Sequence, residues 1–458
     1  MKKKFRRIAG IILGILILTG ALSIYFIWQS HDGKAPAMDP AKRELWKSQA
    51  YNYILETDYE HLTLFNYTTD SVLPFAYGHI ERDGTVWIDK IRGNALFNML
   101  MWKPMPIGRF QNGTLSDEIG YRKQFDRIDQ MPQVGISRFS EDPIQNFETF
   151  WQIFDENYAL FGVHSAEWKK LYDDYRPKVK SDTSAGELKQ VFKEIIQKLD
   201  DGHTQVIAGM QGIASQAKED PRTAFYMNNG KKMKEIIQKT YFPDGLNSQL
   251  DGAIQYGQIQ EGIGYIAVDS FNHFDMLQVN PAIDQVVHRL SDVDQIIVDL
   301  RFNGGGSDAF GLDLVSRFAA SQTLAYTKTA RNHKGYDSFL PPTPIYIEPN
   351  ENRINAAEII VLTSRLSTSA AETTRMAFGE LNNVTVIGET TNGVFSDMMF
   401  NILPNQWIVT LSGEKYTDAR GNIYEGAGMP PDEEVIYTEE DLDSERDPVM
   451  AKALELLK

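Results

Sequence analysis

At residues 358–372 the chain has the sequence EIIVLTSRLSTSAAE, an apolar run followed by a polar turn and a segment of helix-forming residues. The apolar run has the length of a buried strand, and Ser369 stands at the predicted start of the helix. A hydroxyl placed there lies near helix amides that favour developing negative charge, as a nucleophile requires. The alternative is that Ser367, Thr368 and Ser369 cap the helix, with Glu372 completing a capping box.

Short apolar runs alternate with helix-like segments along the chain beyond Glu261. The runs are GYIAV, QIIVDL, EIIVLT and VTVIG, and the segments between them include AFGLDLVSRFAA and SAAETTRMAFGEL. Strands that are apolar along their whole length are typical of a sheet covered by helices on both faces. We therefore expect an α/β core with its functional residues at the strand ends.

A second dense segment, at residues 295–306, has the sequence QIIVDLRFNGGG. Glycine permits positive φ and close backbone approach, and bare amides in such a loop can point at a developing oxyanion. No Gly-Lys-Ser/Thr follows and the dinucleotide spacing is incomplete, so neither kind of phosphate-binding loop is predicted. A tight turn between strand and helix is the alternative interpretation.

A third segment, DDGHT at residues 200–204, follows a helix predicted over 185–199 after the cap-like residues SDTS. A histidine in a tight turn beside acidic residues can be oriented and kept basic, as a general base requires. Taken alone, His203 is better explained as a surface-turn histidine, because it is one of 8 in the chain.

Together these segments resemble the tail-specific, or C-terminal-processing, serine peptidases, and are closer to the tricorn-core-like branch of that family. The motifs that carry the resemblance are DGHT, DLRxNxGG, TSAAE, GExTxG and EGxGxxPD, which stand here at residues 201–204, 299–306, 368–372, 388–393 and 425–432. The resemblance covers roughly residue 147 to the C-terminus. It implies an α/β fold with a Clp-protease/crotonase-like ββα spiral catalytic core, a helical cap, and serine-type peptidase activity on peptides or proteins.

The resemblance also implies the roles of individual residues. Ser369 attacks the scissile carbonyl, His203 takes the hydroxyl proton, and Glu425 supports the imidazolium. An unperturbed histidine pKa of about 6.5 then predicts activity that rises through about pH 6 to 7. Tricorn-like enzymes can have a serine immediately before the histidine, whereas this chain has Gly202, so a relay to Glu425 passes through another hydroxyl or water.

The oxyanion hole that the resemblance implies is made of amides from Gly305 or Gly306 and from Ala370. In the other branch of the family a lysine downstream of the serine is the general base. Val394 occupies the matching position, and valine cannot accept a proton. Lys415, the nearest later lysine, stays open as an alternative base.

The N-terminus suggests attachment to a membrane. Residues 8–28 carry no charge and follow 5 basic residues, Lys2, Lys3, Lys4, Arg6 and Arg7. A cleaved signal usually has an apolar region of about 7–15 residues, whereas a spanning helix needs about 20. We therefore predict a single-pass signal-anchor transmembrane helix within residues 1–30, with the body outside the cytoplasm. A cleaved signal is the alternative.

The remaining modules are predicted from changes in composition and in hydrophobic pattern along the chain. They are a linker over 31–42, a small mixed module of unknown role over 43–135, a helical cap ending in DGHT over 144–205, a connecting segment too short for a full PDZ module over 206–258, the catalytic core over 259–437 and a C-terminal helix over 438–458.

Composition excludes several classes of function. The 458 residues carry a formal net charge of −16, which disfavours nucleic acid as a partner. The absence of cysteine excludes disulfides, thiolate nucleophiles and Cys-ligated zinc. No cofactor or metal is predicted, and the oligomeric state is not determined. A catalytically silent peptide-binding protein and a nonpeptide serine hydrolase on the same scaffold are alternatives to the peptidase.

Overall fold

A computed structural model describes residues 35–93, 104–164, 167–208, 213–215 and 220–457. The predicted signal-anchor lies outside these residues. Within the described ranges, no helix combines the length and the apolarity that crossing a membrane requires.

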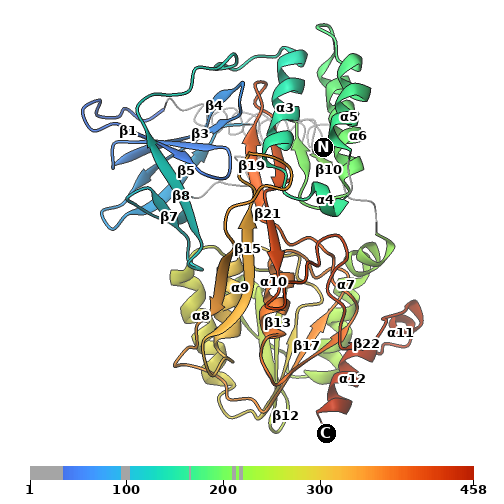
Figure 1. Cartoon of the computed structure of the whole chain (residues 1–458). Coiled ribbons are helices and arrows are strands. Elements are labelled where there is room, and N and C mark those ends of the chain that lie inside the picture. The colour runs from blue at the N-terminus through green and yellow to red at the C-terminus, as the bar shows by residue number, and fades with distance from the viewer. Residues whose placement is uncertain (1–34, 94–103, 165–166, 209–212, 216–219, 458) are drawn as a thin grey trace, which may run out of the picture.

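The N-terminal module is a closed antiparallel barrel of eight strands (Figure 1). Each strand pairs with the next, and the barrel closes where Trp46 of the first strand faces Arg127 of the last. The predicted turn before TVWIDKI is present, with Gly84 at φ +89° and its N–H bonded to the Glu81 carbonyl. The strands are β1 (Glu44–Ser48), β2 (Tyr53–Thr57), β3 (His61–Tyr67), β4 (Val72–Ile80), β5 (Thr85–Ile91), β6 (Met105–Gln111), β7 (Thr114–Ser116) and β8 (Arg122–Ile128).

The sequence predicted only a small mixed module at this place. The closure of the barrel depends on pairing between β1 and β8, which are far apart in sequence, and local periodicity carries no signal for such a pair.

Four helices follow the barrel and carry the predicted aromatic stripe. Phe147, Phe150 and Phe154 are fully buried and pack with Trp168 and Phe192. The last helix begins after the Ser184 capping box, as the sequence indicated, and ends at Asp200 in a left-handed conformation with φ +53°. The helices are α3 (Pro143–Asn157), α4 (Phe161–His164), α5 (Trp168–Tyr175) and α6 (Ala185–Leu199), with the 3-10 turn η1 (Arg176–Lys178) after α5.

The centre of the C-terminal half is a seven-stranded sheet in the order β11-β12-β13-β14-β17-β18-β22. The pairs β13–β14, β14–β17, β17–β18 and β18–β22 are parallel, so the carboxyl ends of these strands share one edge. The strands are β11 (Asn247–Gln249), β12 (Ile254–Gln260), β13 (Ile263–Val268), β14 (Gln295–Asp299), β17 (Glu358–Thr363), β18 (Val384–Gly388) and β22 (Glu433–Glu434), and the 3-10 turn η3 (Leu250–Gly252) precedes β12.

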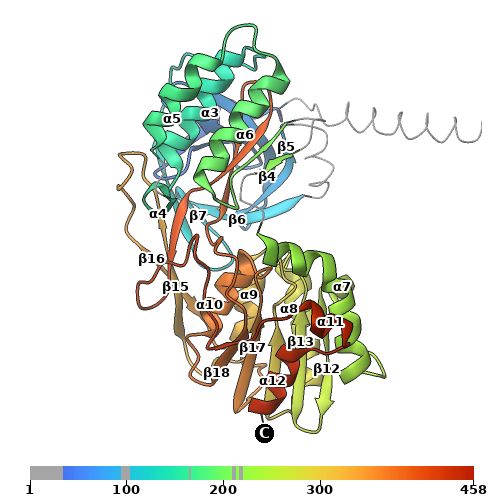
Figure 2. The same ribbon diagram turned by 90° about the vertical axis from the view of Figure 1, so that its right-hand side faces the viewer.

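Helices cover both faces of this sheet, which explains the continuous apolar runs. Along β14, Ile296 and Val298 belong to one core cluster and Ile297 belongs to the other. The first cluster contains residues of α8 (Met276–Arg289), α9 (Asp308–Ser316) and α10 (Ala370–Phe378), and the second contains residues of α7 (Pro221–Tyr241), α11 (Glu439–Asp443) and α12 (Pro448–Leu456). Figure 2 shows α7, α11 and α12 together on one side of the sheet. The expected mixed α/β class is therefore confirmed.

Two smaller sheets join the core to the rest of the molecule. One has the order β16-β15-β21 and the other the order β10-β9-β20-β19. Ile207, Ile402 and Ile408 of the second sheet are part of the barrel's apolar core. Asn66 Oδ1 of β3 also accepts a 2.9 Å hydrogen bond from Ile402 N. The strands are β9 (Gln205–Ile207), β10 (Ile213–Ser215), β15 (Thr323–Ala330), β16 (Thr343–Ile347), β19 (Met398–Ile402), β20 (Ile408–Ser412) and β21 (Glu414–Thr417).

Candidate active site

The glycine loop and the serine turn meet at the carboxyl edge of the parallel strands. The loop follows β14 and the turn follows β17, and these strands are direct neighbours. The Thr368 N–H donates to the Asn303 carbonyl oxygen at 3.2 Å, which ties the two segments together. The chain order therefore places Ser369 beside the glycines, at the edge where function was expected.

Asp299 and Arg301 of the DLR motif hold the base of the glycine loop. The fully buried Arg301 guanidinium forms a two-pronged contact with the Asp299 carboxylate at 2.9 and 2.7 Å and also binds Asp447, the N-cap of α12. A buried charge is stable only when it is paired in this way. These motif residues therefore have a structural role, which fixes the loop against the C-terminal helix.

Ser369 has an unusual backbone conformation at the start of α10. Its φ is +58° and its ψ −121°, whereas an ordinary N-cap residue is extended with negative φ. Such conformations are strained for residues with a Cβ and persist only where surrounding contacts enforce them. Ser369 and Glu372 form the capping box that the sequence indicated, in which Glu372 accepts the Ser369 N–H, and Ser369 is half-buried. A capping box does not require a positive φ, so capping alone does not explain this geometry.

The buried carboxylate of Glu372 holds the serine turn in place. Its Oε2 accepts hydrogen bonds from Ser369 N at 3.2 Å and from Val394 N at 2.8 Å. Its Oε1 accepts from Gly393 N at 2.7 Å and from the Thr391 hydroxyl. Burial raises the pKa of Glu372 to about 7, partly opposed by these donors. The sequence suggested only a capping box here and missed this connection to residues 391–394.

The glycine loop approaches Ser369 too closely for a side chain. Gly305 has φ +101°, and a Cβ built on it would lie 2.7 Å from the Ser369 Cβ. The Gly305 N–H is already bonded to Asn303 Oδ1 at 2.8 Å. Among the described residues, neither the Gly306 N–H nor the Ala370 N–H donates to a protein acceptor. Of the three predicted oxyanion donors, the geometry therefore favours Gly306 and Ala370 over Gly305.

His203 is buried in the turn after α6. Asp201 Oδ1 accepts the His203 N–H at 2.8 Å, and the Thr410 hydroxyl donates to the His203 carbonyl at 2.6 Å. Burial lowers the pKa of His203 below its usual 6.5, opposed by the charges of Asp201 and Asp397. The imidazole is therefore neutral at pH 7, the state that can accept a proton.

Val394 lies between the histidine turn and the serine turn. A Cβ built on Gly202 would lie 2.6 Å from Val394 Cγ2, and the Val394 carbonyl accepts the Ser369 N–H at 3.0 Å. The residue at the position of the family's alternative lysine thus contacts both turns. No hydrogen bond between the Ser369 hydroxyl and the His203 ring is found in the described part of the chain.

Glu425 is held by the backbone that follows Val394. Its Oε2 accepts hydrogen bonds from Phe395 N at 3.0 Å and Ser396 N at 3.2 Å. Burial and the negative charge of Asp201 raise the pKa of Glu425 well above its usual range. No direct hydrogen bond joins Glu425 to His203 within the described residues.

A tyrosine that the sequence analysis did not single out lies in this cluster. Tyr158, at the end of α3, is fully buried, and burial with the nearby charges of Asp201 and Glu425 raises the pKa of its hydroxyl well above the usual value. Four buried polar atoms here lack a hydrogen-bond partner among the described residues: Tyr158 Oη, Asp201 Oδ2, His203 Nδ1 and Glu425 Oε1. The sequence signal for Tyr158 was hidden in an aromatic stripe that is otherwise core.

Two lysines, Lys415 and Lys328, are alternative candidates for the general base, and the structure gives the surroundings of each. Lys415 lies on β21 with its ammonium 3.9 Å from the centre of the Phe339 ring. Lys328, on β15, is almost fully buried and pairs with Asp397 at 2.6 Å and Glu414 at 3.3 Å. Those carboxylates raise the pKa of Lys328 well above its usual value, against the effect of burial, so this lysine is protonated and is unsuited to act as a base.

Comparison with known sequence families gives two matches. Residues 262–435 match peptidase family S41, and residues 139–197 match the tricorn protease C1 domain. Ser369, the glycine loop and Glu425 fall within the first match, whereas His203 falls between the two. Both matches agree with the resemblance that the motifs carry.

Solved structures give the same result. A candidate peptidase from Parabacteroides merdae ATCC 43184 is 28% identical, with a TM-score of 0.60, over 69% of this chain and 97% of that chain. Mature CPAF is 12% identical, with a TM-score of 0.54, over 69% of this chain and 96% of that chain. At this identity the second likeness concerns the fold alone.

Proposed function

We propose that this chain, a serine-type peptidase with a peptidase family S41 domain, cleaves peptide bonds with Ser369 as nucleophile and His203 as general base. The observation that carries the proposal is the strained positive φ of Ser369 at the N-terminus of α10, next to two amides without protein acceptors. A backbone forced into this conformation presents a side chain outward from a crowded turn, as a nucleophile requires.

The proposed reaction begins when the Ser369 hydroxyl oxygen attacks the scissile carbonyl carbon and its proton passes to His203. The carbonyl oxygen becomes an oxyanion, which the N–H groups of Gly306 and Ala370 stabilise. His203 then returns the proton to the leaving amine, and an acyl-enzyme on Ser369 remains until water hydrolyses it by the same proton transfers. Loss of one oxyanion donor typically lowers turnover by about 10²–10³-fold.

Glu425 and Tyr158 are proposed to support His203 on the side of the imidazole that faces away from Ser369. The Tyr158 hydroxyl carries a strongly raised pKa beside Asp201 and Glu425, so it remains a proton donor throughout the reaction. It supplies the hydroxyl that Gly202 does not provide. In this arrangement the charge of Asp201 stabilises the imidazolium, Glu425 supports it as part of the same buried cluster, and Tyr158 positions the two carboxyl groups relative to each other.

The membrane attachment is part of the same proposal. The uncharged run at residues 8–28 and its basic flank favour a single-pass anchor with the catalytic body outside the cytoplasm. Protease added outside intact cells should then remove the body and leave the anchor with the membrane. Cleavage only after permeabilisation would overturn the orientation, and a mature chain that starts near His31 would establish a cleaved signal.

The catalytic proposal is tested with a serine-directed covalent probe and a diverse peptide library. Wild-type protein should be labelled at Ser369 and should cleave peptides, and Ser369→Ala should lose both with an unchanged fold. If Ser369 acted only as a cap, Ser369→Ala would lose about 1 kcal/mol of stability and keep its turnover. Hydrolysis of esters without peptides would favour a nonpeptide hydrolase, and peptide binding without labelling would favour a silent binding protein.

A further inference from the structure

Two adjoining cavities lie where the barrel meets the catalytic core. The first, of about 200 Å³, is lined by Gly306 and Ser307, by barrel residues 106–108 and 117–119, and by Lys328. The second, of about 520 Å³, extends along α8, α9 and β16. The two share Glu118, Ile119 and Ala309 and therefore adjoin, and we name them together the barrel–core groove.

The groove begins at the proposed oxyanion hole. Gly306 contributes to the wall of the first cavity, and its N–H is one of the two amides without a protein acceptor. When the scissile carbonyl of a peptide accepts a hydrogen bond from this amide, the residues on one side of the scissile bond are within reach of the groove.

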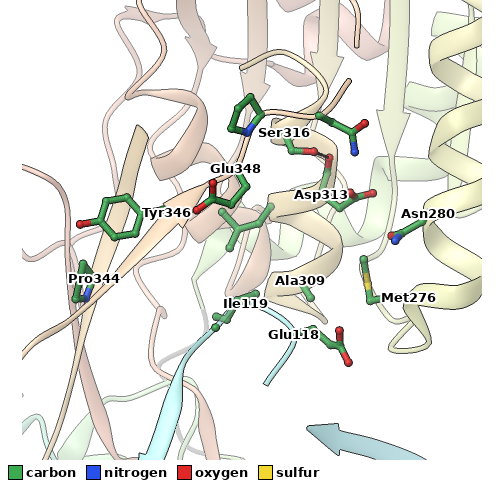
Figure 3. Close-up of a pocket in the computed structure, with 14 residues that line it drawn as sticks. Glu118, Ile119, Met276, Asn280, Ala309, Asp313, Ser316, Pro344, Tyr346 and Glu348 are labelled. Carbon is green, nitrogen blue, oxygen red and sulfur yellow. Dashed lines mark hydrogen bonds between the residues drawn. The ribbon is translucent and has the colours of Figure 1, made fainter. Parts of the chain in front are cut away.

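Figure 3 shows how the larger cavity is enclosed. Pro344, Tyr346 and Glu348 come from or directly follow β16 on one side, Met276 and Asn280 come from α8 on the other, and Glu118 and Ile119 reach in from the turn between β7 and β8. The barrel is thus part of the wall, and its tip faces the catalytic core.

The groove carries an excess of negative charge. Asp117, Glu118, Asp308 and Glu348 line it, and no ion pair joins any of them to a cation among the described residues. Lys328 is the one cation among the described lining residues, and it pairs with Asp397 and Glu414. Burial raises the pKa of Asp308 to about 6, so this carboxylate is ionised at neutral pH.

Apolar side chains are exposed at the same place. Phe274, 45% exposed, lines the first cavity, and Tyr346, 42% exposed, lines the second. Large exposed apolar residues that gather beside a depression are typical of a binding site. The groove therefore combines apolar contact surface with carboxylates that form no ion pair among the described residues.

We infer that the barrel–core groove binds the substrate next to the scissile bond and selects a segment with a lysine or arginine side chain beside an apolar residue. The cation would be attracted by Asp117, Glu118, Asp308 and Glu348, and the apolar neighbour would pack on Phe274 or Tyr346. This inference rests on the proposed peptidase function and assigns the barrel a part in substrate recognition.

The test uses the full chain and matched fluorogenic peptides in which one position at a time is Lys, Arg, Gln or Glu. At one position or more, kcat/KM should be about tenfold higher for Lys or Arg than for Gln, and lowest for Glu. The ratio should fall as salt concentration rises, because Glu118 and Glu348 are exposed to solvent. Glu118→Gln and Glu348→Gln should each reduce the Lys/Gln ratio by about two- to fivefold, mainly through slower cleavage of the Lys peptide.

Glu261→Gln is the matched control, since Glu261 is an exposed carboxylate in the turn between β12 and β13. The inference is wrong if wild type cleaves peptides but shows no preference for a cation at any position, or if both groove variants keep the wild-type ratio. Absence of all peptide cleavage together with absence of serine labelling would instead overturn the proposed function itself.

Discussion

The Ser369 N–H donates a 3.0 Å hydrogen bond to the carbonyl oxygen of Val394, and the Val394 side chain packs against Gly202, the residue before His203. One residue therefore contacts both the serine turn and the histidine turn. In the lysine-dependent branch of the family this position supplies the base. Valine has no group that accepts a proton, so in this chain the residue can only hold the two turns in place.

The contact between Gly202 and Val394 predicts the effect of installing the serine that tricorn-like enzymes can carry at this place. In Gly202→Ser the new Cβ would lie 2.6 Å from Val394 Cγ2, so the histidine turn or the serine turn must move. A misplacement of about 1 Å can lower turnover about 10²-fold. The double variant Gly202→Ser/Val394→Ala relieves the overlap and should recover most of the loss in kcat. Wild-type turnover in Gly202→Ser alone would show that this packing does not constrain the site.

Glu372 offers a prediction about the serine turn. Its two carboxylate oxygens accept four hydrogen bonds, from the amides of residues 369, 393 and 394 and from the Thr391 hydroxyl. The amide nitrogen of glutamine cannot accept, so Glu372→Gln leaves buried donors unpaired. We expect a loss of about 1–3 kcal/mol in the free energy of unfolding, measured by denaturant titration, and a lower kcat. Glu380→Gln, at a half-buried site just beyond α10, is the control and should retain kcat.

The sequence predicted much of the core because local signals agreed there. The helix 185–199, its Ser184 cap, the strand before the glycine loop and the strand before the serine turn occur as expected, since continuous apolarity and capping residues act over a few neighbours. The barrel was not predicted, because its closure is a pairing between distant strands. The catalytic roles of the site residues stay predictions, although the structure now defines the contacts that each of these residues makes.

Two features of the site had no local sequence signal. Tyr158 occupies a position that apolar periodicity assigns to core, and only the fold brings its hydroxyl near Asp201 and Glu425. The Gly305 amide was a reasonable oxyanion donor until Asn303, two residues earlier, proved to bind it. Contacts of this kind depend on side-chain direction, which residue spacing does not encode.

The buried state of His203 predicts the pH dependence of catalysis. Burial lowers its pKa below 6.5, so the neutral base persists to lower pH than in an unperturbed histidine. The acid limb of kcat/KM should therefore lie below about pH 6.5, rather than between about 6 and 7. The same shift implies that folding stability decreases as the pH falls below about 6.5, because the unfolded chain then binds a proton that the folded chain does not.

Single variants distinguish His203 from a lysine as the general base. His203→Ala should reduce kcat about as severely as Ser369→Ala, and the double variant should be no worse, since both belong to one catalytic unit. Lys415→Ala should stay within a few-fold of wild type. An inactive Lys415→Ala beside a nearly active His203→Ala would assign the base to lysine.

Tyr158→Phe tests whether the buried hydroxyl acts on His203 or only packs. Phenylalanine keeps the ring among Phe154 and Phe161 but removes Oη. If Tyr158 positions the carboxylates behind His203, kcat should fall with little change in KM, and the acid limb of kcat/KM should move. The effect should also be non-additive with Glu425→Gln, which is expected to be milder than His203→Ala. Tyr175→Phe, another buried tyrosine of the helical layer, is the matched control. A purely structural hydroxyl would lower the melting temperature in both tyrosine variants and leave the pH profile where it was.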